Sequence, residues 1–464
     1  LAELGDGRSA QLCLQGTPLT PEPALAIGRA LLRGNREQQQ RGEAMLLQLT
    51  QDHPESVEAL EAAALLSEPL HPRQALIDAL PDSLQQGSAD VAAARVRLDG
   101  GEGGLMVLKR WPDHPASWQL QWDLAREALL KDQWELARSW LKAIPAAQLP
   151  DPLRARQQFW LGMSIDKLGD SEEANRIWQR LSHEQPPGYY TWRAQVRLGG
   201  GDLPVLSGDR MTAVAETDRL QSAQTWSPLE SGNLLIDELW RLGLNQEAWE
   251  TWRSEAGATS QSPQKLVAEG RLRLGMDDYW NGLSRLWKAS LRLVSPTCNN
   301  RHLLHSSLHP QPLLPVFQEA SKQENVRLEL LQAIARQESR FSPGVASPVG
   351  AVGLLQLMPA TADEMAGEKL SADDLREPGR NSILGARYLA GLLNRWQSNP
   401  WLTVASYNAG PGAAAAWVTA ELEQDPELWV ERIPYPETRL YTKKVLGNLW
   451  AYLNNDSATD RCTE

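Results

Sequence analysis

Three observations in the sequence predict an all-α fold. Apolar residues recur at every third or fourth position from Pro23 to about Trp287, and Pro or Gly falls between the runs. β-branched runs and strict apolar–polar alternation are almost absent, so strands are not expected. A degenerate repeat of helix-sized segments is the third observation. We expect consecutive short helices at 24–32, 43–49, 56–66, 118–130, 134–144, 157–168 and 172–181.

The repeat comprises segments 131–144, 169–181 and 243–254. Each segment has a polar start, then an alanine, then a tryptophan three or four residues later; the alanines are Ala137, Ala174 and Ala248. A small residue lets a neighbouring helix approach, and the tryptophan fills the groove beside it. Stacked helix pairs hide their apolar faces against one another in this way. The pattern predicts a superhelical, TPR-like solenoid of helix pairs over residues 1–295.

Composition excludes several classes of function. The 464 residues are 42% hydrophobic and 22% charged, which is ordinary for a globular protein. The formal net charge of −12 argues against a nucleic-acid partner, because phosphate binding needs a basic face. No apolar stretch approaches 18 residues, so no transmembrane segment is expected. The 19 tryptophans fit helix packing better than sugar binding, because most fall at helical spacing.

Two segments look irregular. Residues 88–104 are rich in Gly, Ala and Asp and are expected to form a loop between helical blocks. Residues 294–315 are broken by Pro and are the best candidate for a domain boundary. We therefore expect the solenoid at 1–295, a linker at 296–314 and a second domain at 315–464. The linker contains His302, His305 and His309, but no carboxylate or cysteine lies at a useful offset, so a linker is favoured over a metal site.

The three cysteines, Cys13, Cys298 and Cys462, form no metal cluster, and no metal or cofactor is expected. Cys298 and Cys462 bracket the C-terminal region, but the sequence alone does not favour a disulfide between them. No signal peptide is visible. The chain opens on Leu1, so earlier removal of a secretion signal stays open.

One carboxylate has a physical reason to be unusual. Residues 325–341 read as an amphipathic helix whose apolar stripe includes Leu330 and Ile334, and Glu338 lies at its last turn. The negative end of the helix dipole and an apolar face both disfavour the anion. Both effects raise the pKa of Glu338, as a general acid near neutral pH requires. Taken alone, however, an ordinary surface glutamate is the favoured interpretation.

Four ordered motifs change that interpretation. Glu338–Ser339 is followed by S-P-x-G-A-x-G-L-x-Q-x-M-P at 347–359, in which residues 354–358 are expected to begin a helix that Pro359 interrupts. Next comes Y-N-A-G-P at 407–411, ending an apolar helix that begins near Trp401, and then E-T-R-x-Y at 437–441, opening the last helix. Over about 315–454, the order and separation of these motifs resemble the soluble lytic transglycosylase family, whose catalytic domain is similar to goose-type lysozyme.

The resemblance implies an enzyme that cleaves the β-1,4 bond between N-acetylmuramic acid and N-acetylglucosamine in peptidoglycan. Glu338 matches the catalytic glutamate. It would protonate the glycosidic oxygen and then take the proton of the muramic C6 hydroxyl, which leaves a 1,6-anhydro end. Most glycosidases need two carboxylates. Asp363 and Glu364 are not reliably placed to be the second, so the substrate's acetamido group is expected to assist.

The resemblance also implies substrate-binding roles. Ser347 would hydrogen-bond near the cleaved bond, Gln356 would bind sugar or orient the glutamate, and Met358 would wall the acetamido pocket. Tyr407 and Asn408 would steady the acetamido group, Glu437 would contact sugar or peptide stem, and Tyr441 would lie near Glu338. The partners implied are peptidoglycan strands and muropeptides, and the location is the periplasm or cell envelope. Partners in the cell-wall machinery stay open.

Structural roles compete with several of these. Core packing is equally plausible for Met358, and helix capping for Asn408 and Glu437. Arg439 is expected to form an ion pair rather than to bind ligand. Turns with positive φ are favoured over ligand contact for the glycines, which are Gly350, Gly353, Gly410 and Gly412.

Two other functions stay open. One is a goose-type hydrolase, which would use water; the motif set and the helical region favour transglycosylation. The other is a non-catalytic glycan-binding repeat scaffold, against which the intact Glu338 motif argues. With two modules, deleting 1–295 is expected to leave the chemistry on small fragments intact.

Overall fold

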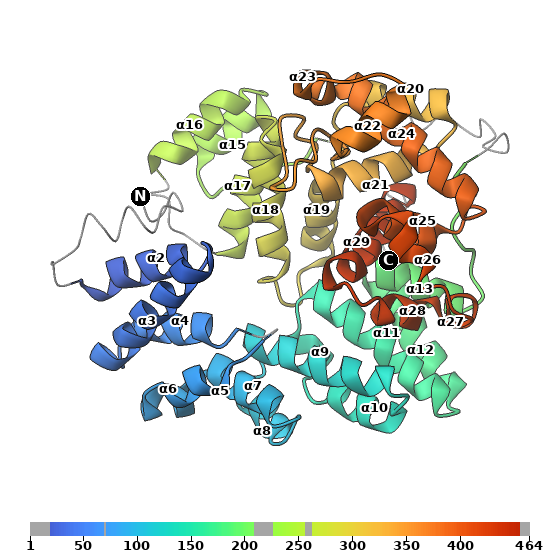
Figure 1. The fold of residues 1–464 in the computed structure, drawn as a ribbon. Helices are drawn as coiled ribbons and strands as arrows, with labels where there is room; N and C mark the ends of the chain where they lie inside the picture. Colours follow the sequence, from blue (N-terminus) through green and yellow to red (C-terminus); the bar gives the residue numbers. More distant parts are fainter. Residues whose placement is uncertain (1–18, 69–70, 208–225, 256–261, 455–464) are drawn as a thin grey trace. The chain divides into compact units, whose positions relative to one another are not determined.

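A computed structural model describes residues 19–68, 71–207, 226–255 and 262–454. The chain divides into two compact units, Leu1–Leu149 and Pro150–Glu464. The all-α prediction is confirmed: these ranges are mainly helical, with isolated β-bridges but no strand among them (Figure 1).

The first unit is a run of short helices, and its helices at 24–32, 43–49, 56–66, 118–130 and 134–144 form close to where they are predicted. Side-chain caps start several of them; Asn35, for example, forms a capping box with Gln38. The helices are α2 (Pro21–Leu31), α3 (Arg36–Asp52), α4 (Val57–Leu66), α5 (Gln74–Asp78), α6 (Asp82–Gly87), α7 (Ala89–Leu98), α8 (Gly104–Arg110), α9 (Pro115–Leu130), α10 (Trp134–Lys142) and the 3-10 turn η1 (Ala146–Gln148).

The prediction of a loop at 88–104 is wrong for most of its length. Residues 89–98 form α7, and the Ser88 hydroxyl accepts a hydrogen bond from the backbone of Val91 as the N-cap. Four alanines in ten residues favour the helix, because alanine has the highest helix propensity. Only the glycine-rich end, with positive φ at Gly100, Gly101 and Gly103, forms a turn.

The second unit contains the remaining helices. They are α11 (Asp151–Lys167), α12 (Ser171–Glu184), α13 (Tyr189–Arg197), α15 (Leu234–Arg241), α16 (Asn245–Glu255), α17 (Pro263–Gly275), α18 (Tyr279–Ser290), α19 (Cys298–Leu308), α20 (Leu314–Glu324), α21 (Leu328–Glu338), α22 (Pro359–Ala366), α23 (Ala372–Arg376), α24 (Pro378–Arg395), α25 (Pro400–Ala409), α26 (Pro411–Ala415), α27 (Glu421–Gln424), α28 (Pro426–Arg432) and α29 (Pro436–Leu453).

The alanine–tryptophan repeat has the packing role predicted for it. Ala137, Ala174 and Ala248 are fully buried in α10, α12 and α16, each of which packs against a neighbouring helix. In α12, the Trp178 ring lies on Gly162 of α11, where an added Cβ would come within 2.5 Å of its Nε1. Trp178 Nε1 donates to the Phe159 carbonyl oxygen over 3.1 Å. The repeat therefore marks helix pairs, as expected.

The predicted linker contains a helix. Residues 298–308 form α19, which packs against α18. His305 of this helix and His309 directly after it are buried, with ring centroids 4.5 Å apart. Helices before and after this segment share one hydrophobic core, which includes Trp192 of α13, Leu286 of α18 and Leu449 of α29. The division at 296–314 stays a prediction, while the compact unit of the structure begins at Pro150.

Helices α13 and α29 approach backbone to backbone. An added Cβ at Gly447 in α29 would lie 2.9 Å from the backbone nitrogen of Tyr189. Trp192 of α13 stacks on Trp401 of α25, with ring centroids 5.2 Å apart. The helix that precedes the motif region by more than 100 residues is thus part of the core beneath it.

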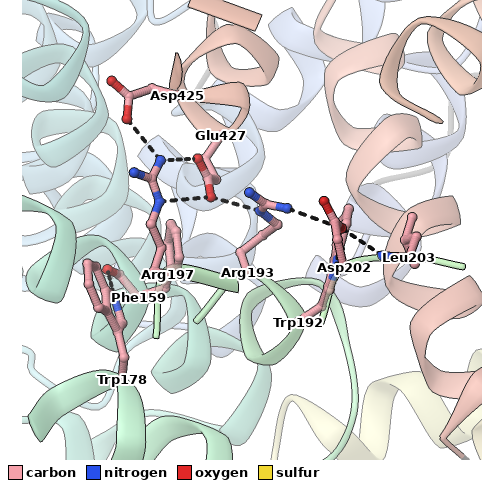
Figure 2. Close-up of polar contacts among 9 residues, drawn as sticks. All are labelled: Phe159, Trp178, Trp192, Arg193, Arg197, Asp202, Leu203, Asp425 and Glu427. Atoms are coloured by element: carbon pink, nitrogen blue, oxygen red, sulfur yellow. Dashed lines mark hydrogen bonds and ion pairs between the residues drawn. The ribbon is translucent and has the colours of Figure 1, made fainter. Parts of the chain in front are cut away.

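Buried ion pairs reinforce this contact. The carboxylate of Glu427, at the start of α28, is fully buried; it accepts from Arg193 Nε over 2.8 Å and from Arg197 Nη2 over 2.6 Å (Figure 2). Arg197 also donates to Asp425 over 2.9 Å, and Lys167 Nζ lies 2.7 Å from the same carboxylate. Burial acts to raise the pKa of Glu427, but the two guanidinium groups outweigh it and hold the pKa below its usual range.

Within the described ranges, no helix has both the length and the apolar character needed to cross a bilayer. Packing explains many of the tryptophans, since Trp160, Trp178, Trp192 and Trp429 are buried. Trp226, Trp280 and Trp287 are exposed.

Candidate functional site

Glu338 is the last residue of α21. The helix runs from 328 to 338, shorter than the expected 325–341, because Asn325 ends α20 in the left-handed region. Leu330, Leu331 and Ile334 of the predicted stripe are fully buried. They fix the helix against the core and bring the carboxylate of Glu338 to the edge of that core.

The electrostatics of Glu338 suit an acid and a base. Burial raises its pKa, a hydrogen bond from Tyr441 lowers it, and the negative charge of Glu437 raises it, for a result of about 7. The helix C-terminus acts in the same direction as burial. Near neutral pH, therefore, the protonated and the ionised forms coexist in comparable amounts.

Tyr441 is the direct partner of Glu338. Its phenol donates to Glu338 Oε1 over 2.6 Å from the buried face of α29. Burial, then the charge of Glu338, raise the pKa of this phenol well above its ordinary value. The phenol therefore stays a hydrogen-bond donor at every physiological pH.

Tyr407 reaches the same carboxylate electrostatically from α25. Burial and then the charge of Glu338 raise the pKa of its phenol. The hydroxyl itself donates to the Leu355 carbonyl oxygen over 2.9 Å. Tyr407 therefore fixes the loop after α21, and this bond limits what its hydroxyl can offer to a ligand.

That loop, residues 342–358, is held by tight turns. The Ser347 hydroxyl accepts from the Ala351 backbone over 2.9 Å. Gln356, with φ of 47°, donates through Nε2 to the carbonyl oxygens of Val345 and Gly353. Residues 354–358 do not form the predicted helix: Val352 and Leu357 pair in a β-bridge, and α22 begins at Pro359. Proline is favoured in the first turn of a helix, so it starts this helix rather than interrupting one.

Two polar residues to which the sequence analysis assigned no role, Asn381 and Ser339, hold this loop. Asn381 of α24 is fully buried; its Oδ1 accepts from Leu355 N over 2.8 Å, and its Nδ2 donates to Val352 O and Leu375 O. Ser339 Oγ donates to Leu354 O over 2.8 Å. An asparagine on the buried side of a helix is the one signal that could have pointed to Asn381.

The predicted glycine turns are confirmed at three positions. Gly350, Gly353 and Gly410 have φ of 92°, 85° and 84°. At Gly353 an added Cβ would also lie 2.2 Å from Leu375 O. Gly412 was predicted with them, wrongly: it lies in α26, outside the positive-φ region, because Pro411 starts a helical turn there.

The remaining predicted site residues are Asn408, Glu437 and Met358. Asn408 accepts through Oδ1 from Thr438 Oγ1 over 2.6 Å, and Glu437 is exposed in the first turn of α29. Neither caps a helix, because Asn399 and Tyr435 are the N-cap residues of α25 and α29. Core packing is also wrong for Met358, which is 43% exposed.

Ion pairs connect α28 with α29. Glu431 of α28 is buried and pairs with Lys443, and Arg439 Nε lies 3.9 Å from its Oε2. The ion-pair prediction for Arg439 is confirmed. With Arg193 and Arg197 on Glu427, these pairs fix α28 between α13 and α29, and α29 carries Tyr441.

Other predicted elements lie outside this site. Among the described residues, no group of three or more His, Cys, Asp or Glu side chains could hold a metal ion. Cys298 is disulfide-bonded, and Cys13 and Cys462 lie outside the described ranges, as does the pairing of Cys298 with Cys462 that the sequence did not favour. Asp363 accepts from Leu370 N at the end of α22.

Comparison with known proteins gives a match in the region of the sequence motifs. Residues 315–430 match the family model of the Transglycosylase SLT domain. The soluble lytic murein transglycosylase of Salmonella typhimurium is 29% identical over 371 residues, or 78% of this chain and 49% of the relative. That of Escherichia coli is 26% identical over the same shares. The chain thus spans about half the length of the curated relatives it matches.

A solved structure shows the same fold. It is an inactive Glu-to-Gln variant of lytic transglycosylase Slt from Pseudomonas aeruginosa, with a TM-score of 0.52 and 21% identity, covering 99% of this chain and 87% of that chain. The motifs, the helical fold and the relatives agree. Residues 315–430 thus form a Transglycosylase SLT domain, and the chain is similar to soluble lytic murein transglycosylases.

Proposed function

We propose that the protein is a lytic transglycosylase that cleaves the β-1,4 bond between N-acetylmuramic acid and N-acetylglucosamine in peptidoglycan, without using water. The observation that carries the proposal is Glu338, whose pKa is raised to about 7 and whose Oε1 accepts from Tyr441. The SLT domain and the names of the relatives support the same activity.

In the first step, protonated Glu338 donates its proton to the glycosidic oxygen. The bond from this oxygen to muramic C1 breaks, and the N-acetylglucosamine side leaves as an alcohol. The acetamido carbonyl oxygen of the same muramic residue attacks C1, which gives an oxazolinium ion. Substrate assistance of this kind removes the need for a second carboxylate.

In the second step, ionised Glu338 takes the proton of the muramic C6 hydroxyl. The C6 oxygen attacks C1, the bond to the acetamido oxygen breaks, and a 1,6-anhydro ring forms while Glu338 returns to its protonated state. Attack within one sugar is favoured by proximity. A pKa near 7 lets one group perform both transfers with little energetic bias.

The surrounding residues support these steps. Tyr441 stabilises the carboxylate and holds it in one orientation. Because Asn408 uses its oxygen on Thr438, its amide nitrogen is the group that would donate to the acetamido oxygen. Ser347, Gln356, Met358, Tyr407 and Glu437 are proposed to line the substrate path with it.

The proposed substrate implies both the ligands of the protein and its location in the cell. Peptidoglycan strands and muropeptides are the proposed ligands, and the periplasm or cell envelope is the proposed location. Neither proton transfer calls for a metal or cofactor, since Glu338 serves as the acid and then the base.

The test is mass spectrometry of digested peptidoglycan. The parent protein is expected to give 1,6-anhydromuramoyl ends, and Glu338→Gln to lose activity, because glutamine keeps the shape without the titratable proton. Glu319→Gln, at an exposed position on α20, is the matched control. Products heavier by one water would identify a hydrolase, equal lysis by Glu338→Gln would remove Glu338 from the mechanism, and an inert parent would indicate a glycan-binding scaffold.

A further inference from the structure

The chain leaves α21 through two consecutive residues in the left-handed region. They are Arg340 and Phe341, with φ of 48° and 61°. Residues with side chains rarely adopt this conformation, because the Cβ comes too close to the following carbonyl oxygen, and a bulky residue makes it rarer still. The sequence pattern predicts a helix through residue 341, whereas α21 ends at Glu338. Contacts from other parts of the fold must therefore hold this turn.

The start of α18 supplies such contacts. Trp280 O accepts from Arg340 Nη1 over 2.7 Å, and the Arg340 guanidinium lies over the Trp280 ring, 4.6 Å from its centroid. The preceding residue, Tyr279, meets the buried ring of Phe341 edge-on, with centroids 6.2 Å apart. Phe341 also packs edge-on against Phe317 of α20. Two successive residues of α18 thus contact two successive residues of the turn, and these contacts can offset the backbone strain.

The start of α18 is itself held in place. Asp278 is its N-cap: Oδ1 accepts from Asn281 N over 3.2 Å, and Oδ2 accepts from Arg273 Nη1 of α17 over 2.7 Å. Helices α17 and α18 also approach closely, since an added Cβ at Gly282 would lie 3.0 Å from Gly270 O. The residues that contact the turn therefore stand on a fixed support.

The left-handed turn decides what lies beside Glu338. In a helix that continued, Phe341 would follow Glu338 by three residues and lie on the same face. Helical side chains lean toward the N-terminus, so the ring would cover the carboxylate. In the structure Phe341 instead enters the core, and Ser339 Oγ donates to Leu354 O of the following loop over 2.8 Å. The turn thus keeps the ring away from the carboxylate and joins the end of α21 to the loop.

We infer that two residues of α18, Tyr279 and Trp280, are positioning residues for the reaction at Glu338. They hold Arg340 and Phe341 in the left-handed conformation and so end α21 at the proposed acid and base. The inference rests on the proposed function for the reaction itself. Since α18 lies outside residues 315–430, a helix that precedes the SLT domain takes part in setting the geometry of its site.

Substitutions at Arg340 separate the backbone conformation from the side-chain contact. Trp280→Ala removes the ring beneath the guanidinium and is expected to lower kcat/KM on small peptidoglycan fragments about fivefold, because part of the population then adopts the helical turn. In this background Arg340→Gly should restore kcat/KM to within about twofold of the parent, since glycine adopts positive φ freely. Arg340→Ala removes the same side chain but keeps the strain, so it should not restore activity. Trp287→Ala, at a similarly exposed position on α18, is the control and should change nothing.

Restoration by glycine is not expected of a residue that only stabilises the fold, because the second substitution removes a further side chain. The same kcat/KM for glycine and alanine at position 340 would overturn the inference. An unchanged kcat/KM in Trp280→Ala would overturn it as well.

Thermal unfolding separates this inference from the proposed function, because it needs no turnover. Arg340→Gly is expected to unfold about 2 °C above Arg340→Ala, the reverse of their order in a continued helix, where alanine is favoured. Trp280→Ala should lower the Tm of the parent but not that of Arg340→Gly, which lacks the guanidinium. A Tm of Arg340→Gly at or below that of Arg340→Ala would contradict the strained turn. If the parent cleaves no fragment, the proposed function fails, while the Tm comparison still decides whether α18 holds the turn.

Discussion

The phenol of Tyr441 donates to Glu338 Oε1 over 2.6 Å, so the residue proposed as acid and base has one fixed neutral donor. Tyr441→Phe removes this donor from the ionised form. The pKa of Glu338 is then expected to rise above about 7, which moves the alkaline limb of activity to higher pH and lowers kcat roughly tenfold at neutral pH. The measurement is a pH–rate profile. Tyr435→Phe, on an exposed ring, should leave the profile unchanged; an unshifted Tyr441→Phe profile would contradict the assignment.

The ionised form of Glu338 is also expected to lower the free energy of unfolding at alkaline pH. Its pKa is about 7 in the folded chain and near 4.5 when unfolded, so the penalty is absent below 4.5, grows between 4.5 and 7, and is complete above 7. Glu338→Gln removes the charge and keeps an acceptor for Tyr441. It is expected to raise the free energy of unfolding by about 2 kcal/mol at pH 8 and by little at pH 4. Thermal unfolding at both pH values checks this, and a gain that does not depend on pH would argue against burial as its cause.

Asn381 is expected to matter for activity although it lies behind the loop. Asn381→Asp keeps the acceptor for Leu355 N but replaces both donors with a charge that faces carbonyl oxygens. We expect a loss of about 2–4 kcal/mol in stability. Activity should fall through kcat more than KM, because the loop beside Glu338 shifts. Asn394→Asp, exposed on the same helix, is the control. Wild-type kinetics in Asn381→Asp would show that the loop tolerates the change.

Gly353 should resist substitution more than Gly350 does. Both have positive φ, but only Gly353 lacks space, since its Cβ would meet Leu375 O and Asn381. Gly350→Ala is expected to cost roughly 1–2 kcal/mol from backbone strain alone. Gly353→Ala should cost at least about 3 kcal/mol or displace the loop. Chemical denaturation of the two variants gives the comparison, and equal costs would mean that the contact relaxes freely.

The effect of truncation on folding and activity is expected to depend on where the chain is cut. Cutting at 296 removes Arg193 and Arg197 and leaves the buried charge of Glu427 uncompensated, a cost of about 3–5 kcal/mol. Residues 315–464 alone are therefore expected to fold poorly, in contrast to the simple two-module expectation. Residues 150–464 keep both arginines and should fold and act on small fragments. Circular dichroism and turnover of the two pieces decide this; a well-folded, active 315–464 piece would show that α13 is dispensable.

The sequence predicted the helices and turns that depend on the spacing of residues close together in the chain. The helices α9, α10 and α12 were predicted from apolar spacing, and the turn at Gly353 was predicted from the freedom of glycine to adopt a positive φ. The Ala-rich α7 was missed because its neighbouring glycines suggested a loop. The contact of Asn381 with Leu355 and the pair of Glu427 with Arg193 could not be predicted, because they join residues 26 and 234 positions apart. Such contacts are set by tertiary packing, which no local pattern encodes.

The site residues fall into a buried group and an exposed group, which differ in how well they tolerate substitution. Tyr441, Asn381 and Ser339 are buried and hydrogen-bonded, whereas Met358 and Glu437 are exposed at its edge. Substitutions at the exposed edge leave the core packing intact, while those in the buried group disturb it. Ligand preference can therefore diverge among descendants of this chain while its reaction chemistry is inherited unchanged, and directed evolution of new specificity should begin at the edge.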